Sequence, residues 1–512
     1  MLRFRAPQAR IGRAVTRPVI QTPPKSLYSS KHLSSASNFR KVTKYTLVAG
    51  ALGASGLWWL VTTSIREDDE VAVPRLDNHP TENLNLGKGP CKEDVTRILN
   101  QNAYHFHVKN VAGVDRYDGS QLACFDPCED RFIHGQFSSP WGDGSQWMAW
   151  AIFDGYLGWQ TADLLEKRLL PFVQQILSRV KPALETESMH QVVQRTLMEA
   201  FIRMDESIMH TVRDLPESEE PLQDKMKKIA PAYAGSGALL SLFDPVSGLL
   251  HVAYTGNSRA ILAQKTEDGK WNMIPMTLDH SGYNKNEVER ITKEHPGEED
   301  MVHNGQLVGL PVTRAFGHAR WKFPLALQHD LRRRFGAPSP VKQNILTPPY
   351  LTAAPDVVSF SIDPKKPSFL IMASYGLWEF ITCQQAVDLV GKWIESQGGK
   401  AADGPEPMYK PFDFSHCDDG VKWEFDEKRA TVQDENAAVH LVRNALGGNH
   451  HEMVAGKLAM TAPYSRAVRD DMTVQVVFFN QPGLDNKGKQ NDNVMKTSTT
   501  FIRRCMNIIR FA

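Results

Sequence analysis

The sequence is poor in cysteine, and its first 66 residues contain no acidic residue at all. Six cysteines among 512 residues cannot form a disulfide framework, which excludes the class of small disulfide-rich secreted domains. Apolar residues at 41% and charged residues at 23% exclude a disordered or collagen-like chain. The sequence has no internal repeat. What is left is a globular chain of two to four domains, or one large domain with insertions.

The near-zero net charge conceals two parts of opposite sign. Residues 1–66 contain eleven Lys or Arg, so the other residues comprise 48 basic and 58 acidic side chains, an excess of ten negative charges. The acidic body has no basic patch that would follow a phosphate backbone, and the sequence therefore predicts no nucleic-acid partner.

The basic head has the composition of a targeting segment. Residues 1–45 are rich in arginine and serine and free of acidic residues, which is typical of a mitochondrial transit peptide. The alternative is a basic tail with no targeting role. We therefore expect a mitochondrial protein.

An uncharged segment follows at residues 46–65. At 1.5 Å per residue a helix of this length spans about 30 Å, the thickness of a bilayer core, so we predict a transmembrane helix in the inner membrane. The alternative is a buried core helix. Lys41 and Lys44 precede the segment, and an acidic run at 67–70 follows it. This distribution of charge favours the intermembrane space over the matrix as the location of residues 67–512.

The rest of the chain is predicted to form one folded domain at residues 116–480, after a linker at 66–115 and before a mobile tail with a possible short helix at 481–512. Apolar runs predict strands at 147–153, 236–243, 250–254, 368–373 and 472–479. Helical periodicity predicts helices at 92–100, 161–180, 190–213, 286–294, 383–396 and 437–445, with Pro171 kinking or splitting the second. Grouped strands and paired helices indicate an α+β sandwich.

Short carboxylate motifs stand beside these apolar runs. Asp154 follows the first run directly, and Asp470 lies just before the last. Oxygen ligands at strand ends suit Mg²⁺ or Mn²⁺. Each motif alone is weak, because Asp-Gly usually marks a turn.

The order of the motifs resembles that of the metal-dependent protein phosphatases, the type 2C family, over about residues 121–479. The motifs are Glu129-Asp130, Phe153-Asp154-Gly155, residues 235–238, residues 256–260, residues 313–317, residues 373–378 and residues 469–473. Gln121-Leu122 and residues 294–298 are similar to the mitochondrial pyruvate dehydrogenase phosphatase branch and its fungal relatives.

The resemblance implies two packed antiparallel β-sheets flanked by antiparallel helix pairs, and phosphoproteins as substrates. It also implies a two-ion Mg²⁺ or Mn²⁺ centre that activates water to attack phosphoserine or phosphothreonine. The metal positions that it implies are Glu129, Asp130, Asp154, the Gly155 carbonyl and Asp470.

Four positions depart from the family pattern. Tyr375 replaces an aspartate ligand, and a neutral phenol is a poor ligand for a hard cation. Tyr156 replaces the histidine that serves as general acid. Asn257 and His318 each replace an aspartate.

These departures suggest a phosphatase fold with a degenerate metal centre, retaining one ion or none. We expect a weakly active or inactive protein that binds phosphoproteins or regulates a relative. The alternative is an active Mg²⁺- or Mn²⁺-dependent serine/threonine phosphatase, acting on pyruvate dehydrogenase or another mitochondrial phosphoprotein. We also hypothesise that Tyr156 and Tyr375 together fill the vacated metal pocket.

Overall fold

The computed structural model describes residues 89–180, 188–213, 215, 219–298, 300–341, 345–397, 425–461, 464–481 and 484. The predicted transit peptide at 1–45, the predicted membrane span at 46–65 and nearly all of the predicted tail at 481–512 lie outside these residues. Within the described ranges, no helix has the length and apolar character needed to cross a membrane. Residues 89–115, predicted as part of a linker, contribute a helix and a strand to the fold.

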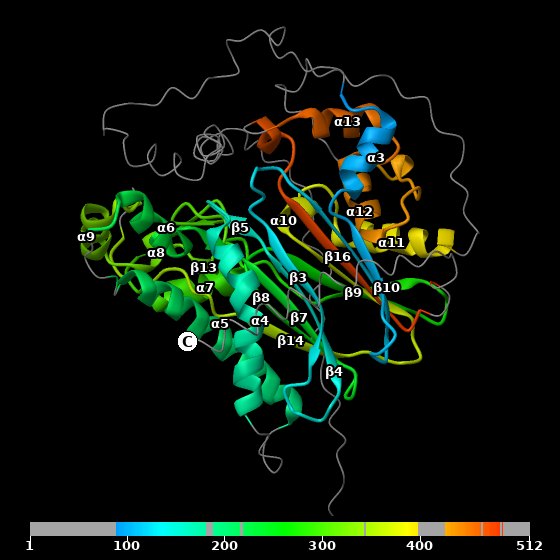
Figure 1. Ribbon diagram of the computed structural model, residues 1–512, viewed down its shortest axis with the longest axis horizontal. Helices are drawn as coiled ribbons and strands as arrows, with labels where there is room; N and C mark the ends of the chain where they lie inside the picture. The colour runs from blue at the N-terminus through cyan, green and yellow to red at the C-terminus, as the bar shows by residue number, and fades with distance from the viewer. Residues whose placement is uncertain are drawn as a thin grey trace, which may run out of the picture. The chain divides into compact units, whose positions relative to one another are not determined.

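Two antiparallel sheets form the centre of the fold, as the α+β prediction requires (Figure 1). The six-stranded sheet has the order β1 (Tyr104–His107), β2 (Val114–Leu122), β16 (Met472–Phe479), β15 (Ser368–Ala373), β9 (Arg259–Lys265), β10 (Trp271–Pro275). The five-stranded sheet has the order β14 (Asp356–Ser361), β8 (Leu249–Thr255), β7 (Ala238–Asp244), β4 (Gln146–Phe153), β3 (Arg131–Ser138).

A small third sheet has the order β13 (Phe316–Gly317), β6 (Gly235–Ser236), β5 (Gly155–Tyr156). A hairpin of β11 (Val302–His303) and β12 (Gln306–Leu307) completes the described strands. The short strands matter for the site, because Asp154 alone separates the end of β4 from the start of β5.

Helices cover the outer faces of both large sheets (Figure 1). On the five-stranded side lie α4 (Gln160–Arg179), α5 (Met189–Arg213), α6 (Leu222–Tyr233), α8 (Ala319–Lys322) and α9 (Leu325–Phe335). On the six-stranded side lie α3 (Lys92–Asn100), α10 (Tyr375–Trp378), α11 (Cys383–Gln397), α12 (Ala437–Leu446) and α13 (His451–Ala459). Helix α7 (Lys285–Glu294) packs in a separate small core.

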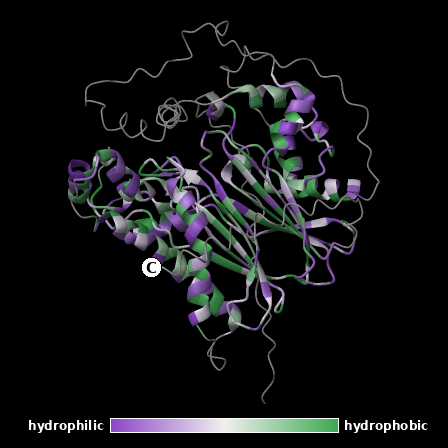
Figure 2. Cartoon of the chain, in the orientation of Figure 1, coloured by the Kyte–Doolittle hydropathy of each residue, from purple (hydrophilic) through white to green (hydrophobic). Residues whose placement is uncertain are grey.

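Strand β4 explains why the fold has two large cores. Its alternate residues Trp147 and Phe153 face the core beneath the helices, whereas Trp150 faces the core between the sheets. Side chains of a strand alternate between its two faces, so a strand buried on both reads as one continuous apolar run. Figure 2 shows the resulting concentration of hydrophobic residues along the central strands.

Pro171 does not split the helix in two, because α4 continues through it as one helix. A proline removes one helical hydrogen bond, but Leu165, Leu169 and Val173 form a buried stripe on both sides of it. Burial of that stripe holds the helix together. Helices α6, α9 and α13 are not predicted by the apolar pattern.

Candidate metal centre

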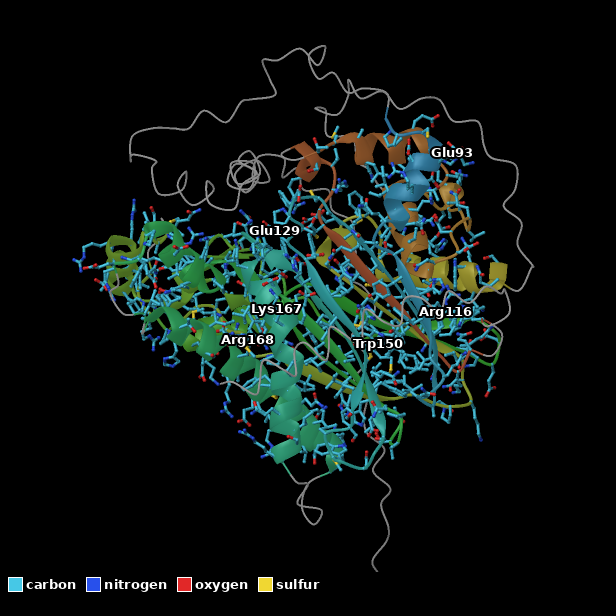
Figure 3. All side chains as sticks on the ribbon, viewed as in Figure 1. Glu93, Arg116, Glu129, Trp150, Lys167 and Arg168 are labelled. Atoms are coloured by element: carbon cyan, nitrogen blue, oxygen red, sulfur yellow. The ribbon has the colours of Figure 1, made fainter. Side chains whose placement is uncertain are left out.

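The strand register brings the motif carboxylates together. Strands β3 and β4 are antiparallel neighbours, so Asp130, just before β3, and Asp154, just after β4, lie at one edge of the five-stranded sheet. Strands β15 and β16 pair in the same way, which places Tyr375 and Asp470 at one edge of the six-stranded sheet. Figure 3 labels Glu129 at this end of the strands, away from Trp150 within the sandwich.

Hydrogen bonds join the ends of the two sheets at this site. The backbone N–H of Tyr375 donates to the Asp154 carboxylate at 3.1 Å. The Thr473 hydroxyl donates to the Asp130 carboxylate at 2.8 Å. Asp130 is 1% exposed, so its carboxylate is held by the protein rather than presented to solvent.

Asp471 has a role that the sequence did not predict. Its carboxylate accepts hydrogen bonds from the backbone N–H groups of Cys124, Phe125 and Glu129, the last at 2.7 Å. It thereby fixes the loop that carries Glu129. The adjacent acidic pair was the only signal in the sequence, because the two segments are more than 340 residues apart.

Position 155 must be glycine because its backbone lies very close to that of Glu129. A Cβ atom at this position would collide with the backbone of Glu129. Residues 154 and 155 therefore lie beside the segment that carries Glu129, and the family resemblance implies that the Gly155 carbonyl, Asp154 and Glu129 surround one ion.

The acidic groups of this cluster resist ionisation. Burial and the charge of Asp471 raise the pKa of Glu129 to about 8. Burial and the charge of Asp470 raise the pKa of Asp154 to about 7. Burial and Asp154 raise the pKa of Asp130 well above its ordinary value. Crowded, desolvated carboxylates of this kind are stabilised as anions by a nearby cation.

The donor set that the family resemblance implies would suit one divalent ion better than two. Glu129, Asp154 and the Gly155 carbonyl would be the oxygen ligands of that ion. At the second position the aspartate is replaced by Tyr375, and Asp470 is already paired with Arg466, whose guanidinium lies 2.6 Å from the carboxylate. Among the described residues, no three His, Cys, Asp or Glu side chains are arranged so that they could hold a metal ion.

Three of the four departures from the family pattern lie in contact with one another. The Tyr156 hydroxyl donates to the Asn257 side-chain oxygen at 2.6 Å. The Tyr156 and His318 rings stack with centroids 5.9 Å apart and planes 6° apart. We call Tyr156, Asn257 and His318 the replacement cluster. Residues that are far apart in the sequence therefore pack together in this cluster.

Glycines make room for the replacement cluster. A Cβ on Gly237 would lie 2.8 Å from the Tyr156 hydroxyl, and one on Gly256 would lie 3.1 Å from it. In the small sheet, β6 lies between β5 and β13, and a Cβ on Gly235 would collide with the His318 ring. Larger side chains at these positions would displace the tyrosine or the histidine.

Burial suppresses acid–base activity within the replacement cluster. It raises the pKa of Tyr156 well above 10, with Asp154 adding to the effect. It lowers the pKa of His318 well below 6.5, so that the imidazole is neutral. A phenol that is reluctant to ionise and donates to an amide oxygen is poorly suited to protonate a leaving group.

Tyr375 lies in a different environment from Tyr156. Burial and the charge of Glu379 raise the pKa of the Tyr375 phenol to about 12, with Arg259 opposing the rise. Tyr156 contacts Asn257 and His318. The hypothesis that Tyr156 and Tyr375 together fill the metal pocket stays a prediction.

Replacing Tyr156 by phenylalanine tests the replacement cluster. Phenylalanine keeps the ring stacked on His318 but leaves the buried Asn257 oxygen without its donor, so we expect a loss of about 1–2 kcal/mol in the free energy of unfolding. Urea denaturation measures this loss. The matched control is Tyr283→Phe, at a side chain 79% exposed, where the change should stay below about 0.5 kcal/mol. Equal effects of both substitutions would contradict the assigned contact.

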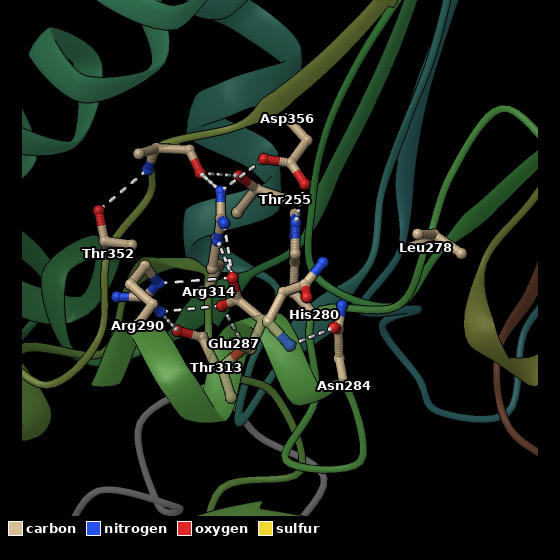
Figure 4. A network of polar contacts seen from close by, with 12 residues as sticks. Thr255, Leu278, His280, Asn284, Glu287, Arg290, Thr313, Arg314, Thr352 and Asp356 are labelled. Carbon is tan, nitrogen blue, oxygen red and sulfur yellow. Dashed lines mark hydrogen bonds and ion pairs between the residues drawn. The ribbon is translucent and has the colours of Figure 1, made fainter. Parts of the chain in front are cut away.

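A polar network supports the loop that carries Asn257 (Figure 4). Glu287 accepts hydrogen bonds from Arg314, Arg290 and Thr313. Arg314 also pairs with Asp356, which contacts His280 at 3.2 Å. The His280 ring in turn accepts from the backbone N–H of Gly256, next to Asn257.

The comparisons with known proteins agree with this architecture. The family model described as Protein phosphatase 2C matches residues 117–407, more than half of the chain. A protein phosphatase 2C homolog of Schizosaccharomyces pombe is 38% identical over 379 residues, covering 73% of this chain and 82% of that protein. The chain belongs to the protein phosphatase 2C family.

Other relatives in the family carry more specific names. The mitochondrial pyruvate dehydrogenase (acetyl-transferring) phosphatase 1 of Saccharomyces cerevisiae is 32% identical over 411 residues, covering 74% of this chain and 71% of that protein. Among solved structures, the serine-threonine phosphatase 2C of Toxoplasma gondii matches with a TM-score of 0.42 and 17% identity, covering 73% of this chain and 99% of that chain. The family model and the two sequence relatives confirm, at the level of the family, the resemblance that the motifs indicate.

Proposed function

We propose that this protein phosphatase 2C family member is a weakly active or inactive mitochondrial phosphatase-fold protein, which binds phosphoserine or phosphothreonine proteins or regulates an active relative. The observation that carries the proposal is the replacement cluster. Its tyrosine occupies the general-acid position of the family and is held by Asn257 at 2.6 Å. General acid catalysis is typically worth about 10²–10⁴-fold in rate, and that contribution is lost here.

The metal centre supports the same proposal. Glu129, Asp154 and the Gly155 carbonyl would hold one Mg²⁺ or Mn²⁺, which would supply positive charge beside a bound phosphate. Asp130 and Asp471 would position the metal ligands and not bind the ion themselves. The Asp130 carboxylate already accepts a hydrogen bond from Thr473, and the Asp471 carboxylate accepts one from the backbone N–H of Glu129. With Tyr375 in place of a carboxylate, we infer that the second ion of the family centre is lost or weakly bound.

The mitochondrial location rests on the basic head and on the names of relatives such as the yeast pyruvate dehydrogenase phosphatase. We propose that residues 46–65 anchor the protein to the inner membrane with the body in the intermembrane space. The uncharged stretch and the charges on either side of it support this part of the proposal.

A second candidate is an active Mg²⁺- or Mn²⁺-dependent serine/threonine phosphatase, with pyruvate dehydrogenase among the candidate substrates. The retention of Glu129, Asp154 and Asp470 at rigid strand ends favours it. Under this alternative, one bound ion and the remaining carboxylates would suffice for hydrolysis.

Phosphate release from phosphocasein in Mn²⁺ separates the two candidates. We expect very slow release by the unmodified full chain, and a rise of at least about 10²-fold in the Tyr375→Asp/Tyr156→His double variant, which restores a metal carboxylate and a general acid. Adding Asp154→Asn to the double variant should abolish the gain. Rapid release by the unmodified chain that is lost in Asp154→Asn would instead establish the second candidate.

A further inference from the structure

An arginine lies between two carboxylates at the candidate metal centre. Arg466 lies on the short helix η5 (Tyr464–Ala467), four residues before Asp470. Its guanidinium lies 2.6 Å from the Asp470 carboxylate and 3.6 Å from the Glu379 carboxylate. The three side chains are only 20–25% exposed, so solvent screens their interaction incompletely.

The two carboxylates that Arg466 bridges come from segments that adjoin neighbouring strands of the six-stranded sheet. Asp470 lies two residues before β16, whereas Glu379 caps the end of α10, the helix that begins with Tyr375. Arg466 thus connects the retained ligand position with the segment that carries the substituted one.

Arg466 also opposes the crowding of negative charge deeper in the centre. Burial raises the pKa of Asp154, of Glu129 and of Glu379, and the charge of Arg466 acts against each of these rises. Its own pKa is raised because the attraction of Asp470 and Glu379 outweighs the effect of burial. One fixed positive charge therefore serves several carboxylates at once.

We infer that Arg466 acts as a permanent internal cation, which holds Asp470 and Glu379 in the place of the second divalent ion and withholds Asp470 from metal. A guanidinium cannot be chelated away or deprotonated at physiological pH, unlike a bound ion. Asp470 and Glu379 are then held in place without a second divalent ion. The inference refines the metal centre of the proposed function, but it concerns binding and not turnover.

Titration calorimetry with Mn²⁺ alone, on the full chain, tests this inference. Arg466→Gln frees Asp470 and Glu379, and we expect Mn²⁺ to bind about tenfold more tightly or better. Arg466→Lys keeps the charge and should retain the affinity of the unmodified chain. The matched control is Arg203→Gln, which removes another Arg–carboxylate pair spaced by four residues, on α5, and should leave the affinity unchanged.

Asp470→Asn provides an independent measurement if Arg466→Gln folds poorly. Asp470→Asn should lower Mn²⁺ affinity much less in the otherwise unmodified chain than in the Arg466→Gln background, because Arg466 already holds Asp470. In the Arg466→Gln background it should cancel the gain. An equal loss of Mn²⁺ affinity from Asp470→Asn in both backgrounds, or no gain in a folded Arg466→Gln variant, would overturn the inference. Either result concerns Mn²⁺ affinity alone, so it does not decide the outcome of the phosphocasein experiment.

Discussion

Glu287→Gln is expected to lower the free energy of unfolding by about 3 kcal/mol, because it leaves two arginines without their shared anion. The Glu287 side chain is 2% exposed and lies 2.5 Å from Arg314 and 2.8 Å from Arg290. Removing one partner of a buried ion pair costs more than the pair itself contributes, since the remaining charge stays desolvated. Urea denaturation at pH 7 gives the value directly.

The matched control for this prediction lies on the same helix. Glu294 pairs with the same Arg290 at 2.7 Å, but its side chain is 50% exposed. Glu294→Gln should therefore cost less than about 0.5 kcal/mol. If the two variants were equally stable, the network of Figure 4 would be a surface feature and not a support for the Asn257 loop.

Acid should weaken this network only at low pH. Burial acts to raise the pKa of Glu287, but the hydrogen bonds from Arg314 and Arg290 outweigh it and lower that pKa far below 4.5. A carboxyl group with a depressed pKa stabilises the fold above its unfolded pKa and loses that contribution as the pH falls. The contribution of Glu287 is therefore present throughout the neutral range.

Asp154 should show the opposite dependence on pH. Its pKa rises from 3.8 to about 7 because of burial and Asp470, so the folded protein takes up a proton that the unfolded chain releases. Stability in metal-free buffer is then lost as the pH rises from about 4 to about 7. We expect Asp154→Asn, which removes the buried charge and keeps an oxygen acceptor for Tyr375, to be more stable than the unmodified chain at pH 8 by about 2–3 kcal/mol.

Thermal denaturation in EDTA from pH 5.5 to 8.5 measures this effect. The midpoint of the unmodified chain should fall across the range, and the midpoint of Asp154→Asn should fall less. Asp143→Asn, at an exposed carboxylate, is the control and should reproduce the slope of the unmodified chain. Parallel slopes for all three proteins would mean that Asp154 ionises freely in the fold.

The layers of the fold could be predicted because both faces of the strands are buried. Trp147 and Trp150 point into different cores, as a strand buried on both faces requires. Helices with a clear apolar stripe were predicted to within a residue or two. Strands such as β2 and β3, which contain many polar residues, were not predicted. Neither were β5 and β13, because two residues carry no periodic signal.

The site could be predicted only where the local sequence carries a motif. Asp154 and Asp470 lie beside apolar strands, and their order along the chain indicates the family. The roles of Asp471 and of Arg466 depend on contacts with Glu129 and Glu379, which are distant in the sequence. The local signals were the adjacent acidic pair for Asp471 and the four-residue spacing to Asp470 for Arg466.

The replacement cluster also bears on how this protein could change in the course of evolution. A histidine in place of Tyr156 would bring a shorter ring, with its donor in a different position, against the Asn257 oxygen and the His318 ring. The effect of a substitution at one of the three positions should therefore depend on the residues at the other two, which is a form of epistasis. Single changes within the cluster would then be tolerated less well than matched changes, and the three positions would tend to evolve together.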